Sequence, residues 1–206
     1  MDRGIYDFIC RLGLSEFITI SNPTAIHISS YAQVINRDFT IDDVERLICV
    51  KILKSDAFSG VDCHADDGKV SLHIRNGDYL LPSKHGYHDC FDRMEYLNKA
   101  INHNGLDGID HVVVFSDDLP LCRGKYNDIL SRRFKTVEYN EETVFEKEFV
   151  RLSLFKNRIN WNSTFSFWTS FIGNVVHDHS GATICPSRFD KNDGIETRID
   201  PRWTVV

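Results

Sequence analysis

Residues 109–118 read IDHVVVFSDD and decide the fold class. In this stretch an apolar run is followed at once by the hydroxyl of Ser116 and two carboxylates. The unbroken apolar run from Val112 to Phe115 is typical of a strand that is covered on both faces in a parallel sheet. Two adjacent carboxylates after such a run cost free energy unless something uses them. The stretch therefore predicts a central parallel strand with a polar cluster at its carboxyl end.

Strand and helix patterns alternate on both sides of this stretch. Short runs rich in β-branched residues predict four further strands: KVSLHIR (69–75), KTVEYN (135–140), RINW (158–161) and ATICP (182–186). Apolar periodicity and charge at the segment ends predict the intervening helices, which cover 90–104, 121–131, 141–157 and 163–173. This alternation predicts an α/β fold, a Rossmann-like parallel sheet with helices on both faces.

Two parts of the chain differ in character. Residues 1–68 contain a predicted helix at Ile41–Leu53, a polar stretch at Ser55–Gly68 and no nucleotide-binding motif. We expect them to form part of an N-terminal, acceptor-side lobe or a cap. Residues 69–206 carry the strand–helix alternation and are expected to form the ligand-binding domain.

The composition excludes several functional classes. With 24 Lys and Arg against 30 Asp and Glu, the formal net charge is −6, so no basic field is available to hold nucleic acid. No run of about 18 apolar residues occurs, so no membrane span is expected. The N-terminus has only short apolar runs and does not resemble a signal peptide, which predicts a cytoplasmic protein. The six cysteines include no C-x-x-C pair, which favours reduced thiols over a disulfide scaffold or a zinc knuckle.

The first polar cluster closes the strand at 69–75. His73 and Arg75 are two residues apart and therefore face the same side of a regular strand. Arg75 offers a planar fork for phosphate oxygens, His73 can donate a further hydrogen bond, and Gly77 lets the backbone turn sharply beneath a ligand. The competing interpretation is a turn held by a salt bridge between Arg75 and Asp78.

The second cluster is Ser116, Asp117 and Asp118. Ser116 can cap the turn, while the two carboxylates can accept hydrogen bonds from a ribose or a guanine edge, or can orient His73 and Arg75. A plain turn followed by a helix N-cap explains the same residues.

The third cluster is Asn162, Ser163 and Thr164, which stand between a predicted strand and an aromatic-rich helix. The backbone N–H groups of a helix start form an anion site, which the hydroxyls would extend. A purely structural aromatic helix is the alternative. The three residues also match the N-glycosylation pattern, although nothing else indicates a secreted chain.

Taken in order, these segments resemble glycosyltransferase family 11, the α-1,2-fucosyltransferases that use GDP-fucose. HIRNGDY (73–79), FSDDLPLC (115–122) and NSTFSFW (162–168) are similar to the family's H-x-R-R-G-D-Y, S-D-D and N-S-S-F-S-W-W motifs. EFVRLSLFKN (148–157) is similar to its D-L-x-L-M-S-x-C-K-H run, with Glu148 in place of the aspartate. The resemblance covers residues 70–203.

The resemblance implies a fold of the GT-B type, in which residues 69–206 form the C-terminal nucleotide-sugar-binding lobe. It implies inverting, metal-independent transfer of L-fucose from GDP-fucose to a hydroxyl of a galactose-containing glycan in α-1,2 linkage. His73, Arg75 and Asp78 are the expected catalytic residues, with Asp78 as the candidate base. The expected donor-binding residues are Gly77, Tyr79, Ser116, Asp117, Asp118, Asn162, Ser163, Thr164, Phe165 and Ser166. No cofactor or metal is expected, and the resemblance leaves peripheral association with a membrane open.

The sequence departs from the family pattern in two places. Asn76 stands where the family has a second arginine, and we expect its side chain to face the ligand if the turn at Gly77 breaks the strand alternation. The glycine-rich G-G-L-G-N-Q-M-F segment does not occur, which leaves a complete enzyme, a fragment and a shortened homologue as alternatives. Two other functions stay open: a nucleotide-sugar-binding protein without transferase activity, and a dinucleotide oxidoreductase, for which the G-x-G-x-x-G fingerprint is missing.

Overall fold

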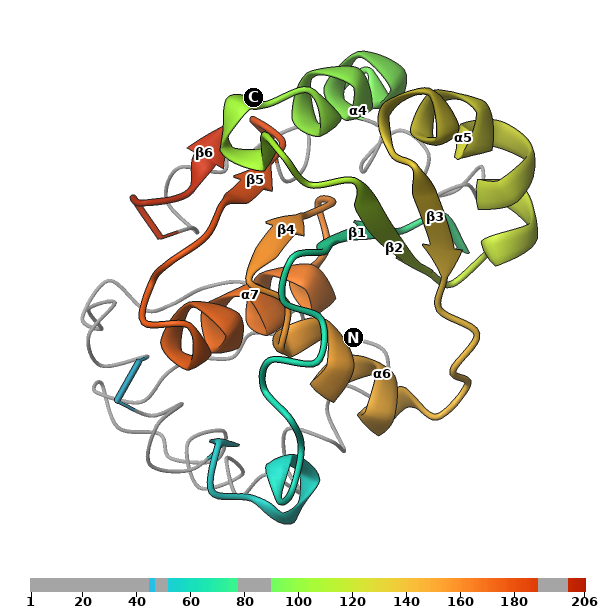
Figure 1. Cartoon of the computed structure of the whole chain (residues 1–206). Helices are drawn as coiled ribbons and strands as arrows, with labels where there is room; N and C mark the ends of the chain where they lie inside the picture. The colour runs from blue at the N-terminus through green and yellow to red at the C-terminus, as the bar shows by residue number, and fades with distance from the viewer. Residues whose placement is uncertain (1–44, 47–51, 78–89, 189–199) are drawn as a thin grey trace, which may run out of the picture.

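The computed structural model describes residues 45–46, 52–77, 90–188 and 200–206. Its centre is a six-stranded sheet in which every neighbouring pair is parallel, in the order β3-β2-β1-β4-β5-β6 (Figure 1). The strands are β1 (Val70–Ile74), β2 (His111–Ser116), β3 (Thr136–Tyr139), β4 (Asn157–Ile159), β5 (Thr183–Cys185) and β6 (Thr204–Val205). The helices are α4 (Arg93–Ile101), α5 (Leu119–Arg133), α6 (Phe145–Ser153) and α7 (Thr164–Val176), with 3-10 turns η4 (Asp56–Phe58) and η6 (Asn104–Leu106).

The Rossmann-like expectation is confirmed, and so are the five predicted strands and the four helices that follow the first four of them. The boundaries differ most at α6, which begins at Phe145 although its pattern begins at Glu141. The Glu142 carboxylate accepts the N–H groups of Thr143 and Val144 at 3.0 and 2.9 Å, and this local bonding keeps those residues out of the helix. The two-residue strand β6 carries too short a pattern to be predicted.

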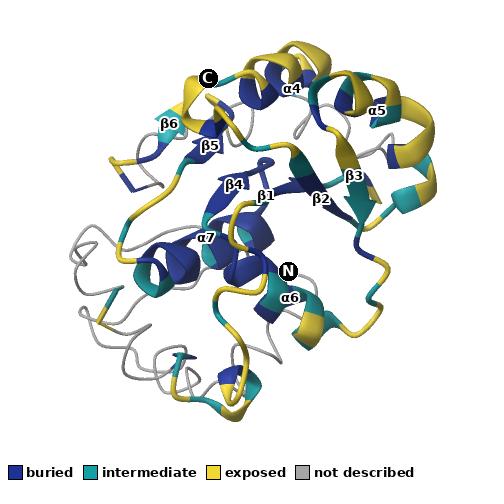
Figure 2. Cartoon of the chain, in the orientation of Figure 1, coloured by how far each residue is buried: buried dark blue, intermediate teal, exposed yellow. Residues whose placement is uncertain are grey.

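Two apolar cores lie on opposite faces of the sheet. One is formed with α4 and α5 and the other with α6, α7 and η4 (Figures 1 and 2). Along β2, Val112 and Val114 belong to the first core, and Val113 and Phe115 belong to the second, as strand alternation requires. Burial on both faces explains why this strand is a continuous apolar run.

The strand order reverses beside β1, which pairs with β2 on one side and with β4 on the other. In open parallel sheets, ligands bind outside the carboxyl ends of the strands at such a reversal. The residues that follow β1 and β4 are therefore the first place to look for a site.

The segment that precedes β1 packs on the α6 side of the sheet. Ile52 and Phe58 are buried in the same core as α6 and α7. Residues 45 and 46 are helical, but most of the helix predicted at Ile41–Leu53 lies outside the described residues, and the division at residue 68 stays a prediction. None of the described helices combines the length and apolar character that crossing a membrane requires.

Candidate functional site

An ion pair joins the ends of the two central strands. Arg75 follows β1 and Asp117 follows β2, and Arg75 Nη1 lies 3.2 Å from Asp117 Oδ2. The side chains are 28% and 25% exposed, so the guanidinium is oriented by the carboxylate while part of it faces solvent. The interpretation that Asp117 orients the first cluster is thereby supported.

Asp117 also holds the backbone that follows Arg75. Its Oδ1 accepts the N–H of Asn76 at 2.9 Å. A Cβ at Gly77 would lie 2.1 Å from Asp117 Oδ2, so only glycine leaves room for this approach. Gly77 thus makes room for the contact between the ends of β1 and β2, and a ligand above it stays a prediction.

The expectation that Asn76 faces a ligand is wrong. The residue is 1% exposed, and its side-chain N–H donates to Cys122 Sγ in α5 at 3.3 Å. The side chain is therefore enclosed beneath the first turn of α5. Strand alternation, which places it opposite Arg75, was the better guide.

Ser116 and Asp118 form the turn and the cap that the second interpretation of their motif predicts. Ser116 Oγ accepts the N–H of Asp118 at 3.1 Å, and Asp118 Oδ1 accepts the N–H of Leu121 at 3.0 Å as the N-cap of α5. Such caps typically stabilise a helix by about 1 kcal/mol. Contact of either residue with a donor stays a prediction.

His73 contributes a neutral ring. It is buried in β1 against Phe165, with ring centroids 5.2 Å apart. The pKa of His73 is lowered to about 3, mainly by burial and in addition by the nearby charge of Arg75. Among the described residues, nothing hydrogen-bonds His73 Nδ1. His73 and Arg75 together therefore provide one permanent positive charge, on Arg75, and one neutral imidazole that can donate or accept a hydrogen bond.

The third cluster lies where β4 passes into α7. Asn162, Ser163 and Phe165 are buried, whereas Thr164, the first residue of α7, is partly exposed. The Ser166 hydroxyl is fully buried and directed to the carbonyl oxygens of Trp161 and Ser163, at 3.1 and 3.0 Å. Within this structure Ser166 holds the start of the helix, and Thr164 is the hydroxyl most accessible to a ligand.

Glu148 in α6 also belongs to this edge. The aromatic rings of Phe145 and Phe149, on either side of it in the sequence, pack on Phe165 with centroids 5.3 and 5.5 Å apart. The pKa of Glu148 is raised to about 7, mainly by burial and in addition by the negative charges of Asp117 and Glu142. A carboxyl group that titrates near neutrality can exchange a proton with a substrate. The sequence showed the acid in a family motif but gave no sign of its neighbours.

Two hollows open beside α6. One, of about 540 Å³, lies at the carboxyl end of β3 and includes Glu142; the other, of about 460 Å³, lies between α6 and residues 57–66. Arg75 lines neither of them. Glu142, which lines the hollow at β3, is close enough to Glu148 for its charge to raise the pKa of Glu148. This hollow therefore opens close to the edge that carries the three clusters.

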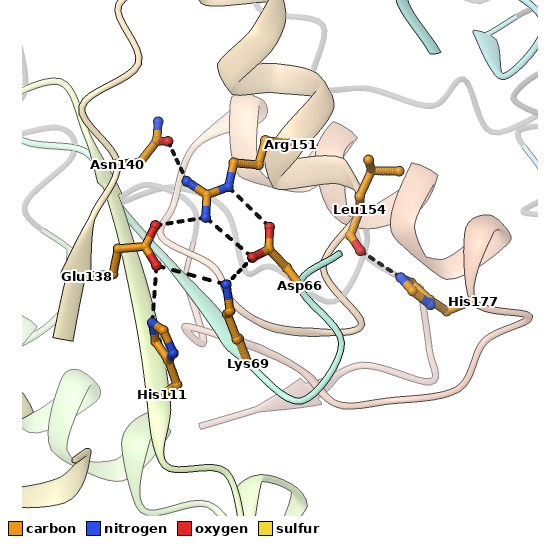
Figure 3. Close-up of polar contacts among 8 residues, drawn as sticks. All are labelled: Asp66, Lys69, His111, Glu138, Asn140, Arg151, Leu154 and His177. Atoms are coloured by element: carbon orange, nitrogen blue, oxygen red, sulfur yellow. Dashed lines mark hydrogen bonds and ion pairs between the residues drawn. The ribbon is translucent and has the colours of Figure 1, made fainter. Parts of the chain in front are cut away.

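The wall between these hollows is a closed network of charges (Figure 3). Arg151 donates to Asp66 at 3.1 Å, to Glu138 at 2.8 Å and to Asn140 at 3.0 Å. Burial would raise the pKa of Asp66, but hydrogen bonds from Arg151 and Lys69 lower it overall. Because each of these charges has an opposite charge beside it, the network is best explained as structural.

Two expected site residues, Asp78 and Tyr79, lie outside the described residues. Their roles stay predictions. The remaining clusters come from three strand ends that are far apart in sequence, and the strand order brings them to one edge.

Comparison with known proteins identifies the family of this sequence. The sequence model described as Glycosyl transferase family 11 matches residues 6–192, which is most of the chain. The chain belongs to glycosyl transferase family 11.

Two relatives in this comparison come from Escherichia coli. An alpha-1,2-colitosyltransferase is 30% identical over 149 residues, which are 66% of this chain and 47% of that protein. The O-antigen biosynthesis glycosyltransferase WbnK is 31% identical over 105 residues, which are 50% of this chain and 34% of that protein. Each match thus spans less than half of the relative's length. No solved structure gives a significant match.

Membership of family 11 confirms the resemblance drawn from the three motifs. In the structure these motifs supply the oriented guanidinium of Arg75, the start of α7 and the carboxyl group of Glu148. Such an edge can hold an anionic leaving group and carry a proton.

Proposed function

We propose that this domain binds GDP-fucose at the carboxyl ends of β1, β2 and β4. In the whole protein, L-fucose would pass to a galactoside hydroxyl in α-1,2 linkage, with inversion and without a metal. The observation that carries the proposal is the placement of Arg75, which Asp117 fixes at the reversal of strand order. This placement is the one that ligand-binding α/β sheets use.

The leaving group requires stabilisation of negative charge. When the bond between the anomeric carbon and the phosphate oxygen breaks, the electron pair leaves with GDP. Arg75 would hold the phosphate with its planar fork, and the N–H groups at the start of α7 would add a partial positive charge. His73 would contribute a hydrogen bond and no charge, since its ring is neutral at pH 7.

The acceptor hydroxyl must lose a proton as its oxygen bonds to the anomeric carbon. We propose Asp78 as the base, because it follows the phosphate-binding arginine in the family motif. Glu148 is a second carboxyl group with a suitable pKa, about 7, beside Asp117. Substitution of each by its amide distinguishes them: the base is the one whose loss lowers the turnover number while GDP still binds.

The identity of the transferred sugar rests on the family resemblance. One relative's name specifies an α-1,2 linkage and colitose as the transferred sugar. A colitosyl donor is therefore the competing substrate to test beside GDP-fucose. The α-1,2 linkage is part of both alternatives.

Titration of GDP into wild type and Arg75→Ala tests the proposal. We expect binding to wild type with or without chelator, and a loss of about 2–4 kcal/mol in the variant, which is roughly 30- to 1000-fold in Kd. Circular dichroism should show both proteins folded, because a strand-end arginine contributes little packing. The matched control is Arg132→Ala, an exposed arginine at the end of α5.

Equal GDP binding by wild type and Arg75→Ala would contradict the phosphate site. Loss of binding with chelator would contradict the metal-independent mechanism. If GDP-fucose binds but no fucose reaches any galactoside, the protein is better described as a nucleotide-sugar-binding protein without transferase activity.

A further inference from the structure

A second polar cluster lies at the opposite edge of the sheet. His64 and Asp67 belong to the segment that leads into β1, and His177 follows α7. His64 Nδ1 lies 2.9 Å from Asp67 Oδ2, and His177 Nδ1 lies 3.9 Å from Asp67 Oδ1. One ligand atom from each of the three residues lies within 4.8 Å of the others.

The orientation of His177 is fixed by its other nitrogen. Its ring is buried, and Nε2 donates to the carbonyl oxygen of Leu154 at 2.7 Å (Figure 3). A carbonyl can only accept, so the proton of the neutral ring is on Nε2 and the lone pair on Nδ1 is directed to Asp67. Histidines that bind metals usually have this arrangement, with the second nitrogen bound to a carbonyl or a carboxylate.

We propose that His64, Asp67 and His177 bind a divalent transition-metal ion, with Zn²⁺ as the best fit. Zinc bonds of about 2.0–2.1 Å in tetrahedral geometry place neighbouring ligand atoms about 3.3 Å apart. One ligand atom from each residue already lies within 4.8 Å of the other two, so modest rotation of the exposed His64 and Asp67 side chains would bring the three to this spacing. Two imidazoles and one carboxylate suit zinc better than Mg²⁺ or Ca²⁺, which prefer oxygen ligands. Water would complete the coordination.

A second cluster of acids and a histidine differs from this one, because an arginine neutralises its carboxylates. Glu45, His179 and Asp200 are also close enough to hold an ion, but Arg202 Nη2 lies 2.5 Å from a carboxylate oxygen of each acid. That guanidinium already supplies the positive charge. Among the described residues, no lysine or arginine forms an ion pair with Asp67. Lys69 and Arg151 form ion pairs with Asp66 instead.

The location predicts a structural ion. An ion bound by His64, Asp67 and His177 would connect the segment before β1 to the end of α7. The hydrogen bond from His177 to the Leu154 carbonyl connects this site to the end of α6 as well. All of these segments precede strands, so they lie at the amino edge of the sheet, whereas Arg75 lies at the carboxyl edge. Binding should therefore stabilise the fold and leave GDP affinity unchanged.

Zinc titration of chelator-treated protein tests this inference, with Co²⁺ absorption as a second readout. We expect one ion per chain, at least tenfold weaker binding in His64→Ala and Asp67→Asn, and unchanged binding in His103→Ala, a histidine in the connection from α4 to β2. At a zinc concentration 100-fold above Kd, the Tm of wild type should rise by about 5–10 °C. The His64 side chain is 71% exposed, so its removal should not unfold the protein.

Equal zinc affinity in wild type and His64→Ala would overturn the proposal, because binding would then come from other groups such as the cysteine thiols. A saturating zinc titration without any rise in Tm would overturn the structural role. GDP titration in the presence and absence of zinc keeps this test separate from that of the donor site.

Discussion

Arg75 and Arg158 are two arginines of the same sheet in very different surroundings. Arg75 follows β1, pairs with the carboxylate of Asp117 and is partly exposed. Arg158 lies within β4 and is 1% exposed, and neutral groups receive its hydrogen bonds: the Phe155 carbonyl at 2.6 Å, Asn174 at 2.5 Å and Thr183 at 2.9 Å. The first can exchange its solvent for a ligand, whereas the second has no room for one.

The interior around Arg158 is shaped to this side chain. A Cβ at Gly173 would lie 1.9 Å from Arg158 Nη1 and 2.9 Å from the carbonyl oxygen of Ser153. Burial lowers the pKa of Arg158 to about 9, although the charge of Asp200 opposes this. The difference from Arg75 teaches that, in this sheet, an arginine stays accessible to solvent where the strand ends and the packing opens, and is enclosed within the strand itself.

The sharpest test of this difference is the same substitution at both positions. We expect Arg158→Met to lower the free energy of unfolding by about 3–5 kcal/mol, because buried acceptors lose their donor. Arg75→Met should lower it by less than about 1 kcal/mol, since a partly exposed ion pair contributes little. Urea denaturation of the two variants measures both values. Similar losses in the two variants would break the comparison.

Asn76 tests where the ligand-facing surface ends. We expect Asn76→Arg to lower the free energy of unfolding by about 2 kcal/mol, because the new charge would be buried beneath α5. GDP affinity and its salt dependence should stay as in wild type. Asn102→Arg, which adds the same charge at an exposed position after α4, is the control for stability. Tighter GDP binding with an unchanged Tm would mean that position 76 reaches the donor.

The smallest expected effect is the contribution of Glu148 to the pH dependence of stability. Its pKa is about 7 in the folded protein against 4.5 as the ordinary value, so the folded state binds more protons between these limits. The contribution of Glu148 to stability is thus fully present below pH 4.5 and is lost as the pH rises through 7. Glu148→Gln should remove this dependence and stabilise the protein at pH 8 by about 1 kcal/mol, a value that allows for solvent screening.

Thermal unfolding from pH 4.5 to 8 measures this effect. Glu95→Gln in α4 serves as the control, because that carboxylate is exposed and paired with Lys99. Asp117→Asn should lower the pKa of Glu148, since it removes one of the negative charges that raise it. A pH profile of Glu148→Gln that follows wild type would show that this carboxyl group is not buried beside Asp117.

The sequence predicted the class of fold and the edge of the sheet at which the three polar clusters meet. Strand alternation, apolar runs and the rule for parallel sheets placed Arg75, Asp117 and Asn162 at strand ends that converge. Contacts within one motif, such as the turn of Ser116 and the cap of Asp118, followed from local rules. These interactions span only a few residues, which is why a sequence pattern can show them.

Contacts between motifs could not be predicted in the same way. The ion pair of Arg75 with Asp117 requires β1 and β2 to be neighbours, and the pKa of Glu148 depends on how α6 packs. The enclosed position of Asn76 depends on Cys122, which is 46 residues away in sequence. Pairings of this kind are set by the tertiary structure, so the sequence offered the contact of Asp117 with Arg75 only as one alternative and gave no sign of the other two.

The pairing of β1 with β4 also determines the order in which the molecule can assemble. β1, β2 and β3 are consecutive in the chain and can pair as soon as residues 70–139 are available, but Val70 aligns with Asn157. Closing a loop of roughly ninety residues costs about 4 kcal/mol of chain entropy before any contact compensates for it. We therefore expect the pairing of β1 with β4 to form late on the folding pathway. A chain that has folded only residues 70–139 presents Arg75 without the start of α7, so it would lack part of the proposed donor site.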